Sequence, residues 1–282
     1  MSAAGPVIGQ PIDRVDGPLK VTGGARFAAE FDQPGLSFAV MVQSTVSRGR
    51  IRRIDRARAE RTPGVVAVLT HENAPALPQK GRAAINPPAG RALSLLQEDV
   101  VHYNGQPIAV VIADTFEHAT EAAGLLRVLY EPQPPVLRFD EARRTAYAPK
   151  AAGRGRTDLA WGNLDAGIAQ GDVRVEAVYT TPMEHHNPME PHATVAHWEG
   201  DRLTLYDATQ YVSGVRNTVA KTFGISPDNV RVISPFVGGG FGCKGSVWSH
   251  VVLAAMAARK VGRPVKLVLT RPQMFGPVGG RP

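Results

Sequence analysis

VRVISPFVGGGFGCKGSVWSHVVLAAMAARKVG, residues 230–262, is the stretch that decides the fold. Its β-branched start predicts a strand over Val230–Ile233, and its apolar end predicts a helix over Trp248–Val261 that stops at Gly262. The loop between them, Pro235–Gly245, contains three consecutive glycines, which remove the Cβ atoms that block close approach and permit positive φ. Such a loop can point backbone N–H groups at a ligand with phosphate or oxo groups, although a flexible turn or tight helix–strand packing is the alternative.

Two phosphate-binding motifs can be tested against this loop. A P-loop needs Gly-Lys followed by Ser or Thr, whereas Lys244 follows Cys243 and precedes Gly245, so this motif is absent. The dinucleotide fingerprint G-x-G-x-x-G does match in form, at Gly240, Gly242 and Gly245. The next strand ends at Thr270-Arg271 without the acidic residue that holds a ribose hydroxyl, but an arginine there could suit a 2′-phosphate. An NADP-type dehydrogenase therefore stays open as an alternative.

Short strands and short helices alternate along the rest of the chain, which predicts an α+β fold. In the first half the pattern predicts strands over Leu36–Gln43, Val65–Leu69, Gln106–Ala113 and Arg127–Tyr130. Helices are expected there over Asp55–Arg61, with Asp55 as N-cap, and over Phe116–Ala123, after the capping pair Asp114-Thr115. The second half predicts a strand over Val173–Thr180, a hairpin of Thr194–Trp198 with Leu203–Tyr206, a helix over Val212–Phe223 and a strand over Pro264–Leu269.

Composition shifts divide the chain into four parts. Residues 1–19 form an N-terminal arm, and residues 20–131 form a first domain. Pro132, Pro134 and Pro135 then break regular structure and open a linker over residues 132–161. Residues 162–282 form the second domain.

The composition excludes several classes of protein. A single cysteine among 282 residues rules out a disulfide framework, a Cys-rich zinc module and an iron–sulfur cluster held by this chain. The longest strongly apolar run, Val251–Ala258, is too short to cross a bilayer. Met1–Gly5 does not open like a signal peptide, so a cytoplasmic location is the default expectation, with export to the periplasm alongside a partner as the alternative.

The net charge of +7 favours anionic partners, and its densest patch lies early in the chain. Ile51 and Ile54 interrupt this patch in a strand-like pattern, and no aromatic residue offers a surface for base stacking. We therefore expect a solvated face or a subunit contact rather than a nucleic-acid site. The patch consists of Arg48, Arg50, Arg52, Arg53, Arg56, Arg58 and Arg61.

A second cluster looks like a metal site but lacks the spacing of one. No H-E-x-x-H motif occurs, and an unbroken polar stretch ahead of a strand does not fix tetrahedral geometry. We expect a structural or cofactor-lining loop instead of a protein-held metal. The cluster consists of Glu184, His185, His186, Glu190 and His192.

Several ordered motifs together resemble one known family. The loop GGGFGxK, Thr209-Gln210 upstream of it and RPVKLVLTR after it resemble the molybdenum-binding subunit of the xanthine dehydrogenase/aldehyde oxidase family. The resemblance runs from about Pro11 to Pro282, and the bacterial aldehyde oxidoreductase type is the most similar. Other matching motifs, in chain order, are Arg14–Gly17, Lys20–Gly23, Thr62–Val65, Gly105–Pro107 and Met189–Pro191.

The resemblance implies a fold and a cofactor. Residues 20–131 would be the α/β hammerhead domain, and residues 162–282 the first part of the molybdopterin-binding domain. The cofactor would be molybdopterin cytosine dinucleotide with molybdenum, held without a protein ligand to the metal. Gln210 would donate a hydrogen bond to a metal oxo group, which an amide can do without titrating. The other expected cofactor-binding residues are Gly239, Gly240, Phe241 and Gly242.

The resemblance also implies an activity and partners. The assembly would oxidise an aldehyde to the carboxylic acid with water as oxygen source, and electrons would pass to separate Fe–S and FAD subunits. Purine-hydroxylating relatives carry a glutamate where this chain has Gly245, which argues against purine substrates. Cys243 replaces a usual glycine and is expected to fill space rather than to react.

The chain is also shorter than complete relatives. Their catalytic base, a glutamate, lies in a part with no counterpart here, so we expect no catalytic residue in this chain and no activity from it alone. A separate polypeptide could supply the C-terminal half. The alternative from another class is a non-catalytic binding or assembly module, or a degenerate remnant.

Overall fold

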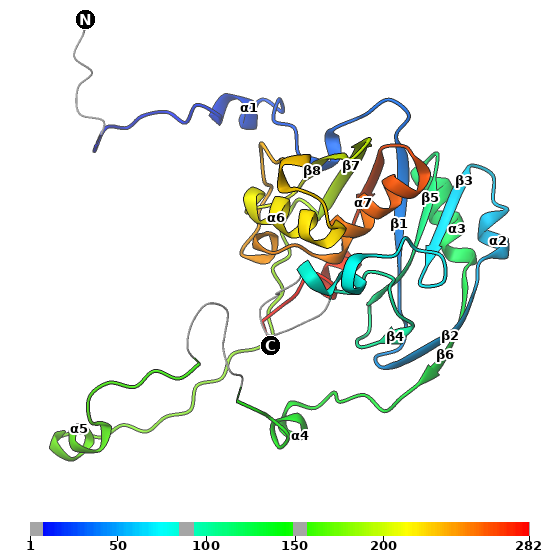
Figure 1. The fold of residues 1–282 in the computed structure, drawn as a ribbon. Coiled ribbons are helices and arrows are strands. Elements are labelled where there is room, and N and C mark those ends of the chain that lie inside the picture. The colour runs from blue at the N-terminus through cyan, green and yellow to red at the C-terminus, as the bar shows by residue number, and fades with distance from the viewer. Residues whose placement is uncertain (1–7, 85–92, 149–156, 282) are drawn as a thin grey trace, which may run out of the picture.

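One seven-stranded sheet carries most of the fold (Figure 1). The computed structural model describes residues 8–84, 93–148 and 157–281. The strands lie in the order β3-β5-β1-β10-β7-β8-β9, so the first three come from the first half of the chain and the others from the second. They are β1 (Ser37–Gln43), β3 (Val65–Thr70), β5 (Pro107–Ala113), β7 (Ala193–Glu199), β8 (Arg202–Asp207), β9 (Val230–Ile233) and β10 (Val265–Val268).

The two halves of the chain meet where β1 pairs with β10. These strands are parallel, with Ser37 opposite Val265 and Ala39 opposite Leu267. β8 and β9 are also parallel, whereas the other neighbours in this sheet are antiparallel. The hydrogen bonds of one sheet therefore run through both sequence halves.

Strand β5 is buried along its whole length because the sheet is covered on both faces. Val110 and Ile112 face the large core around α7 (Ser249–Val261), whereas Val111 faces a smaller cluster with Ala122 of α3 (Phe116–Leu125). Alternate residues of a strand point to opposite faces, so a strand between two layers is apolar throughout. This accounts for the unbroken apolar run in the sequence.

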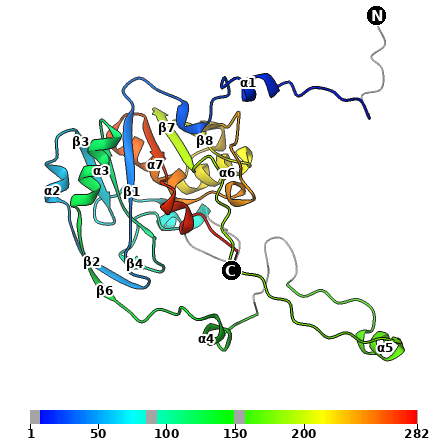
Figure 2. The same cartoon turned by 180° about the vertical axis from the view of Figure 1, so that it is seen from behind.

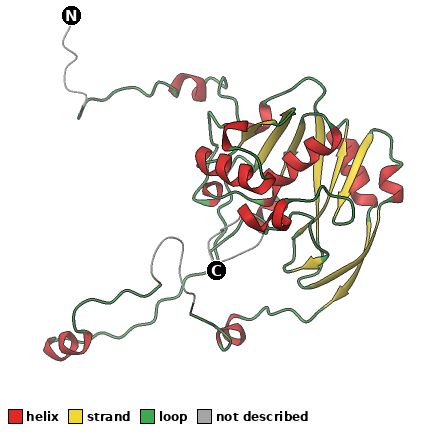
Figure 3. Cartoon of the chain, viewed as in Figure 1, coloured by secondary structure: helices red, strands yellow, loops and turns green. Residues whose placement is uncertain are grey.

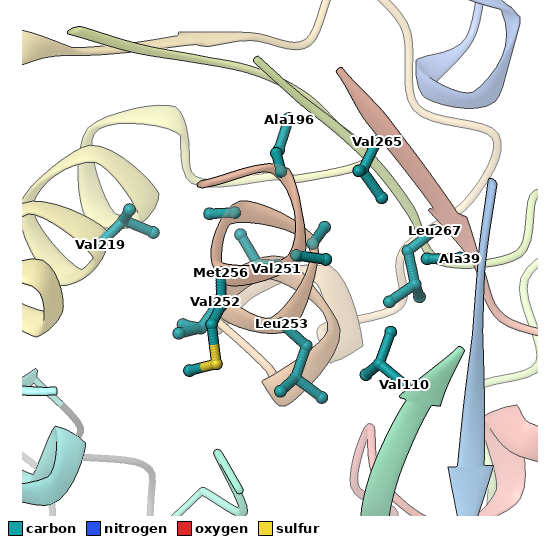
Figure 4. Packing of buried hydrophobic residues seen from close by; sticks show 14 of the residues in the cluster. Ala39, Val110, Ala196, Val219, Val251, Val252, Leu253, Met256, Val265 and Leu267 are labelled. Atoms are coloured by element: carbon teal, nitrogen blue, oxygen red, sulfur yellow. The ribbon is translucent and has the colours of Figure 1, made fainter. Parts of the chain in front are cut away.

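Helix α7 fills the centre of the large core (Figure 4). Residues Ser249–Ala258 of this helix are all buried, as expected for a helix that is apolar all round. In Figure 4, Leu253 lies toward Val110, with Leu267 and Ala39 beyond it. The helix ends at Gly262, whose φ of 64° matches the glycine C-cap predicted from the sequence.

A second, three-stranded sheet extends from the first half of the chain. Its order is β4-β2-β6, from β4 (Val100–Val101), β2 (Gly49–Asp55) and β6 (Arg127–Pro132). Ile51 and Ile54 of β2 are buried, whereas the arginines between them are exposed. The strand-like pattern in the arginine patch is therefore confirmed, and most of these arginines pair with carboxylates: Arg50 with Asp99, Arg52 with Glu131, Arg53 with Asp55, and Arg56 with Glu60 and Glu72.

Most predicted elements occur within a few residues of their expected bounds. Thr115 caps α3 by accepting from the His118 N–H, and α6 (Val212–Phe223) ends at Gly224 with φ of 67°. One helix differs: α2 covers only Ala57–Glu60, because Asp55 is the last residue of β2. Asp55 still accepts from the Ala57 N–H at 3.1 Å. The α+β class is confirmed.

The predicted strand over Val173–Thr180 is wrong. This stretch is extended and exposed, and it pairs with no strand among the described residues. It belongs to an arm over residues 133–183, of which the structure describes 133–148 and 157–183; these two parts run outside the sheets in Figures 1 and 2. Figure 3 shows its described part as loop apart from α4 (Phe139–Arg143) and α5 (Leu164–Gln170). A third short helix, α1 (Gly17–Val21), lies in the N-terminal segment.

No helix in the described ranges is both long and apolar enough to cross a membrane.

Truncating Leu253 should destabilise the whole fold. This side chain is fully buried in α7, so Leu253→Ala should lower the free energy of unfolding by about 2–5 kcal/mol. Leu164→Ala in α5 is the matched control, because Leu164 is 76% exposed, and it should change that free energy by less than about 0.5 kcal/mol. Urea unfolding followed by circular dichroism measures both. Equal losses in the two variants would contradict this packing.

Candidate functional site

Four segments converge at one edge of the large sheet. β8 and β9 are parallel and joined by α6, so their carboxyl ends lie side by side. β7 and β10 are antiparallel to each other, and the start of β7 and the end of β10 reach the same edge, since Thr194 faces Asp207 and Val268 faces Ala193. The residues before β7, after β8, after β9 and after β10 therefore meet there.

The glycine loop after β9 has an unusual backbone. Gly239 and Gly242 have φ of 94° and 99°, and Phe241 between them has φ of 52°. A positive φ is strained for a bulky residue such as phenylalanine, and strain of this kind concentrates at functional sites. The Phe241 side chain is 72% exposed, so apolar burial does not account for its position.

Gln210, three residues after β8, lies directly on Gly240. A Cβ added to Gly240 would come within 2.3 Å of Gln210 Cδ and 2.8 Å of its Nε2. A side chain at this position would push the end of Gln210 aside, because real Cβ atoms do not come so close to a neighbour, so glycine leaves the amide where it lies. The structure thus brings together two residues that lie 30 positions apart in the sequence (240 − 210 = 30).

The loop offers free hydrogen-bond donors. Among the residues that the structure describes, the N–H groups of Gly239, Gly240, Phe241 and Gly242 form no hydrogen bond, and neither does the side-chain amide of Gln210. Backbone N–H groups in consecutive positions, with positive φ among them, form a concave site for anions or oxo groups. The arrangement can therefore bind a ligand rich in acceptor oxygens.

An ion pair lies beneath the loop. Lys244 Nζ donates to Glu190 Oε2 at 2.7 Å and to the Glu190 carbonyl at 2.9 Å. The Lys244 side chain is fully buried and that of Glu190 is 10% exposed. The other carboxylate oxygen, Oε1, is buried without a partner in the described part of the chain, so this end of the loop has one more acceptor to offer.

A buried polar cluster lies behind the ion pair. Burial lowers the pKa of His192 to about 4, with the Lys244 charge acting in the same direction, and burial lowers the pKa of His250 well below its usual range. The two rings meet edge to face at 5.2 Å. Burial raises the pKa of Asp207 to about 7, against a hydrogen bond of 2.5 Å from the Thr194 hydroxyl. The cluster therefore favours neutral side chains around one lysine–glutamate pair.

Cys243 has a structural contact in this site. Its Sγ donates to the Gly240 carbonyl at 2.9 Å, and the thiol is buried. Burial raises the pKa of Cys243, which favours the unreactive thiol over the thiolate.

The two glutamates of the metal-like cluster and the arginine of the possible dinucleotide site have contacts within the protein, whereas ring nitrogens of His185, His186 and His192 are buried without a hydrogen-bond partner in the described chain. Glu190 pairs with Lys244, and Glu184 pairs with Arg281. Among the described residues no group of three or more His, Cys, Asp or Glu side chains is arranged to hold a metal ion. Arg271, considered above for a 2′-phosphate, donates to the carbonyls of Pro188 and Met189 and is therefore engaged within the protein.

The sequence motifs locate the glycine loop and Gln210, but they do not predict what supports them. Glu190 belongs both to the motif Met189–Pro191 and to the metal-like cluster, yet its partner Lys244 lies 54 positions away. The sequence gives one indication of this ion pair: a lysine in a glycine loop without Ser or Thr directly after it, and therefore without the role of a P-loop lysine.

Comparisons with known proteins match both halves of the chain. Residues 22–134 match the model of the aldehyde oxidase and xanthine dehydrogenase a/b hammerhead domain, and residues 147–282 match the model of the molybdopterin cofactor-binding domain. The chain is 38% identical, over 98% of its length, to the aldehyde oxidoreductase molybdenum-binding subunit of Escherichia coli (strain K12), of which it covers 36%. It is 34% identical, over 92% of its length, to subunit gamma of the 6-hydroxypseudooxynicotine dehydrogenase complex of Paenarthrobacter nicotinovorans, of which it covers 34%.

Solved structures agree with this fold. A reconstituted CO dehydrogenase from Oligotropha carboxidovorans superposes with a TM-score of 0.77 at 28% identity, over 95% of this chain and 35% of that one. The aldehyde oxidoreductase from Desulfovibrio gigas superposes with a TM-score of 0.73 at 27% identity, over 93% of this chain and 30% of that one. The chain thus spans about a third of the length of these relatives.

The buried cluster predicts a specific pH dependence of stability. Asp207 has a raised pKa in the folded state, so its contribution is fully present below pH 4 and is lost as the pH rises toward 7. Asp207→Asn removes this loss and keeps an acceptor for Thr194. The free energy of unfolding of the variant minus that of the wild type should therefore increase steadily from pH 4 to pH 7.

Urea unfolding at several pH values measures this difference. His192 and His250 have lowered pKa values, so both proteins lose stability as the pH falls below about 6.5. This effect is common to variant and wild type and cancels when one free energy of unfolding is subtracted from the other. A difference that stays constant across this range would show that Asp207 is charged in the folded protein.

Proposed function

Because the chain belongs to the xanthine dehydrogenase/aldehyde oxidase family, as the first part of its molybdenum-binding subunit, we propose that it holds the molybdenum cofactor of an aldehyde oxidoreductase. The observation that carries this proposal is the row of free N–H donors over 239–242 with the Gln210 amide beside it. The proposed reaction converts RCHO and water into RCOOH, two protons and two electrons. When bound, the cofactor supplies the electron-accepting and oxygen-transfer chemistry of this reaction.

The residues of the loop fit such a cofactor. Gly239 and Gly242 have the positive φ that turns the backbone outward, and Gly240 leaves room for the Gln210 amide. Gln210 Nε2 would donate to an oxo group, and the Gly240 and Phe241 N–H groups would donate to neighbouring acceptor oxygens. The amide does not titrate, so its capacity to donate does not depend on pH. We propose the cytosine dinucleotide form of molybdopterin, since the chain's net charge of +7 suits a phosphate-rich ligand.

Two features bear on the reaction. At Gly245 a Cβ would meet no atom within 4 Å, so the residue after Lys244 leaves space where purine-hydroxylating relatives carry a glutamate. This supports an aldehyde rather than a purine as the substrate. The glutamate base of such relatives is expected outside this chain, so the chain alone should position the cofactor without turning over substrate.

The arm over residues 133–183 supports the proposed partners. Its described parts, residues 133–148 and 157–183, are extended apart from α4 and α5 and carry many exposed apolar side chains, and such a surface marks an interaction site. We propose that a further polypeptide with the remaining length of the molybdenum subunit packs on it, and that Fe–S and FAD subunits accept the electrons. The exposed side chains include Leu159, Trp161, Leu164, Val173, Val175, Val178 and Tyr179.

The function is tested on the complex purified with the products of the neighbouring genes. We expect molybdenum by mass spectrometry, cytidine monophosphate after acid hydrolysis, and aldehyde-dependent dye reduction. The 282-residue chain alone should show no reduction. A folded, metal-free complex without activity would support the non-catalytic binding module instead, and turnover by the isolated chain would contradict the expected absence of the base.

A pair of glycine variants tests the loop itself. Gly240→Ala drives a methyl group into the Gln210 amide and should lower the molybdenum content of the purified complex about tenfold or more. Gly245→Ala is the matched control: its methyl group meets open space at a φ that alanine adopts, so the molybdenum content should stay at the wild-type level. Equal molybdenum in both variants would exclude Gly240 from the cofactor site.

A further inference from the structure

The ion pair of Glu190 and Lys244 needs an explanation beyond stability. Removing two charges from water is costly, and apolar residues of similar volume often stabilise a fold as well as a buried ion pair does. Here both side chains are almost fully out of solvent. What distinguishes the pair is the set of other groups that its two residues bind.

Glu190 holds the start of the glycine loop. Gly238 N–H donates to Glu190 Oε2 at 2.7 Å, and Glu190 N–H donates to the Gly238 carbonyl at 3.0 Å. These two hydrogen bonds hold Gly238 against Glu190. The two residues lie so close together that a Cβ at Gly238 would be 2.5 Å from Glu190 Cβ.

Lys244 holds the end of the loop and the base of Gln210. Its carbonyl accepts from Gln210 N–H at 2.9 Å and from the Thr209 hydroxyl at 3.1 Å. Thr209 Oγ1 in turn accepts from Tyr211 N–H at 3.0 Å, so the backbone is fixed on both sides of Gln210. The backbone of the lysine thus positions the glutamine, while its side chain binds Glu190.

We propose that Glu190 and Lys244 are positioning residues that keep the N–H groups of residues 239–242 and the Gln210 amide in their binding geometry. These N–H groups form no hydrogen bond of their own within the described chain, so the loop depends on its two ends for its shape. The ion pair joins these two ends. What the loop binds rests on the proposed function, whereas the positioning role can be tested without the cofactor.

The test is hydrogen exchange of the loop amides in the 282-residue chain, read by mass spectrometry. The main variant is Glu190→Leu with Lys244→Met, which removes both charges together and so leaves no unpaired buried charge. It should stay folded, yet peptides over 238–244 should lose the protection of their hydrogen-bonded amides, Gly238 and Cys243, which should exchange about tenfold faster or more because Gly238 N–H loses its charged acceptor and the loop loses a fixed end. Peptides of α7 beyond the loop should exchange as in the wild type.

The control is another lysine–carboxylate pair outside the loop, in which the carboxylate is exposed. Lys266 Nζ donates to Asp32 Oδ1 at 2.9 Å. Asp32→Asn with Lys266→Met should leave the exchange of peptides over 238–244 unchanged. If the main variant fails to fold, Glu190→Asp is used instead. Aspartate keeps the charge but is one methylene shorter, so its carboxylate lies farther from Gly238 N–H. This variant should also speed exchange over 238–244.

The outcomes separate this inference from the proposed function. Wild-type exchange over 238–244 in a folded Glu190→Leu/Lys244→Met protein would overturn the positioning role. Molybdenum content is measured separately, in the complex with partner subunits, and should fall in the same variant. A wild-type complex that holds no molybdenum would refute the proposed function, whereas the exchange result would still decide what Glu190 and Lys244 do.

Discussion

The parallel pairing of β8 with β9 is the constraint on which the site depends. Parallel neighbours end at the same edge of a sheet, so the residues after β8 and after β9 must meet, with α6 as the connection between the strands. Gln210 and the glycine loop are the two segments placed there. With Gln210 in this position, a side chain at residue 240 would collide with its amide, so the glycine in the sequence matches the place where the strand topology brings the two segments together.

In the proposed site, the loop would present bare backbone to a ligand without losing its shape. Loops with free N–H groups have few internal bonds and would otherwise move. Here the supporting contacts lie beneath the loop, in a layer of buried polar groups with Lys244 and Glu190 as its charged members. The other side of the loop is left free for the proposed cofactor, and the Phe241 side chain there is exposed.

The sequence predicted the local elements and the motif well, because strands, helix caps and glycine clusters are set by nearby residues. Gly224 and Gly262 end their helices as expected, and β5 is a fully buried strand. Prediction failed where the outcome depends on distant partners. Val173–Thr180 has the composition of a strand, but no strand in the described chain pairs with it. Glu190 forms an ion pair with Lys244, and no local sequence pattern connects these two residues. The division into a domain of residues 20–131 and a domain of residues 162–282 stays a prediction, because the seven-stranded sheet contains strands from both ranges.

The pairing of β1 with β10 has a mechanical consequence. β1, from the first half of the chain, lies between β5 of the same half and β10 of the second half, and it pairs with both. The covalent connection through the arm over residues 133–183 therefore adds little to the cohesion of the body. A protease that nicked the arm would leave both pieces attached through the sheet, and two separately synthesised pieces divided there have complementary edges with which to reassemble.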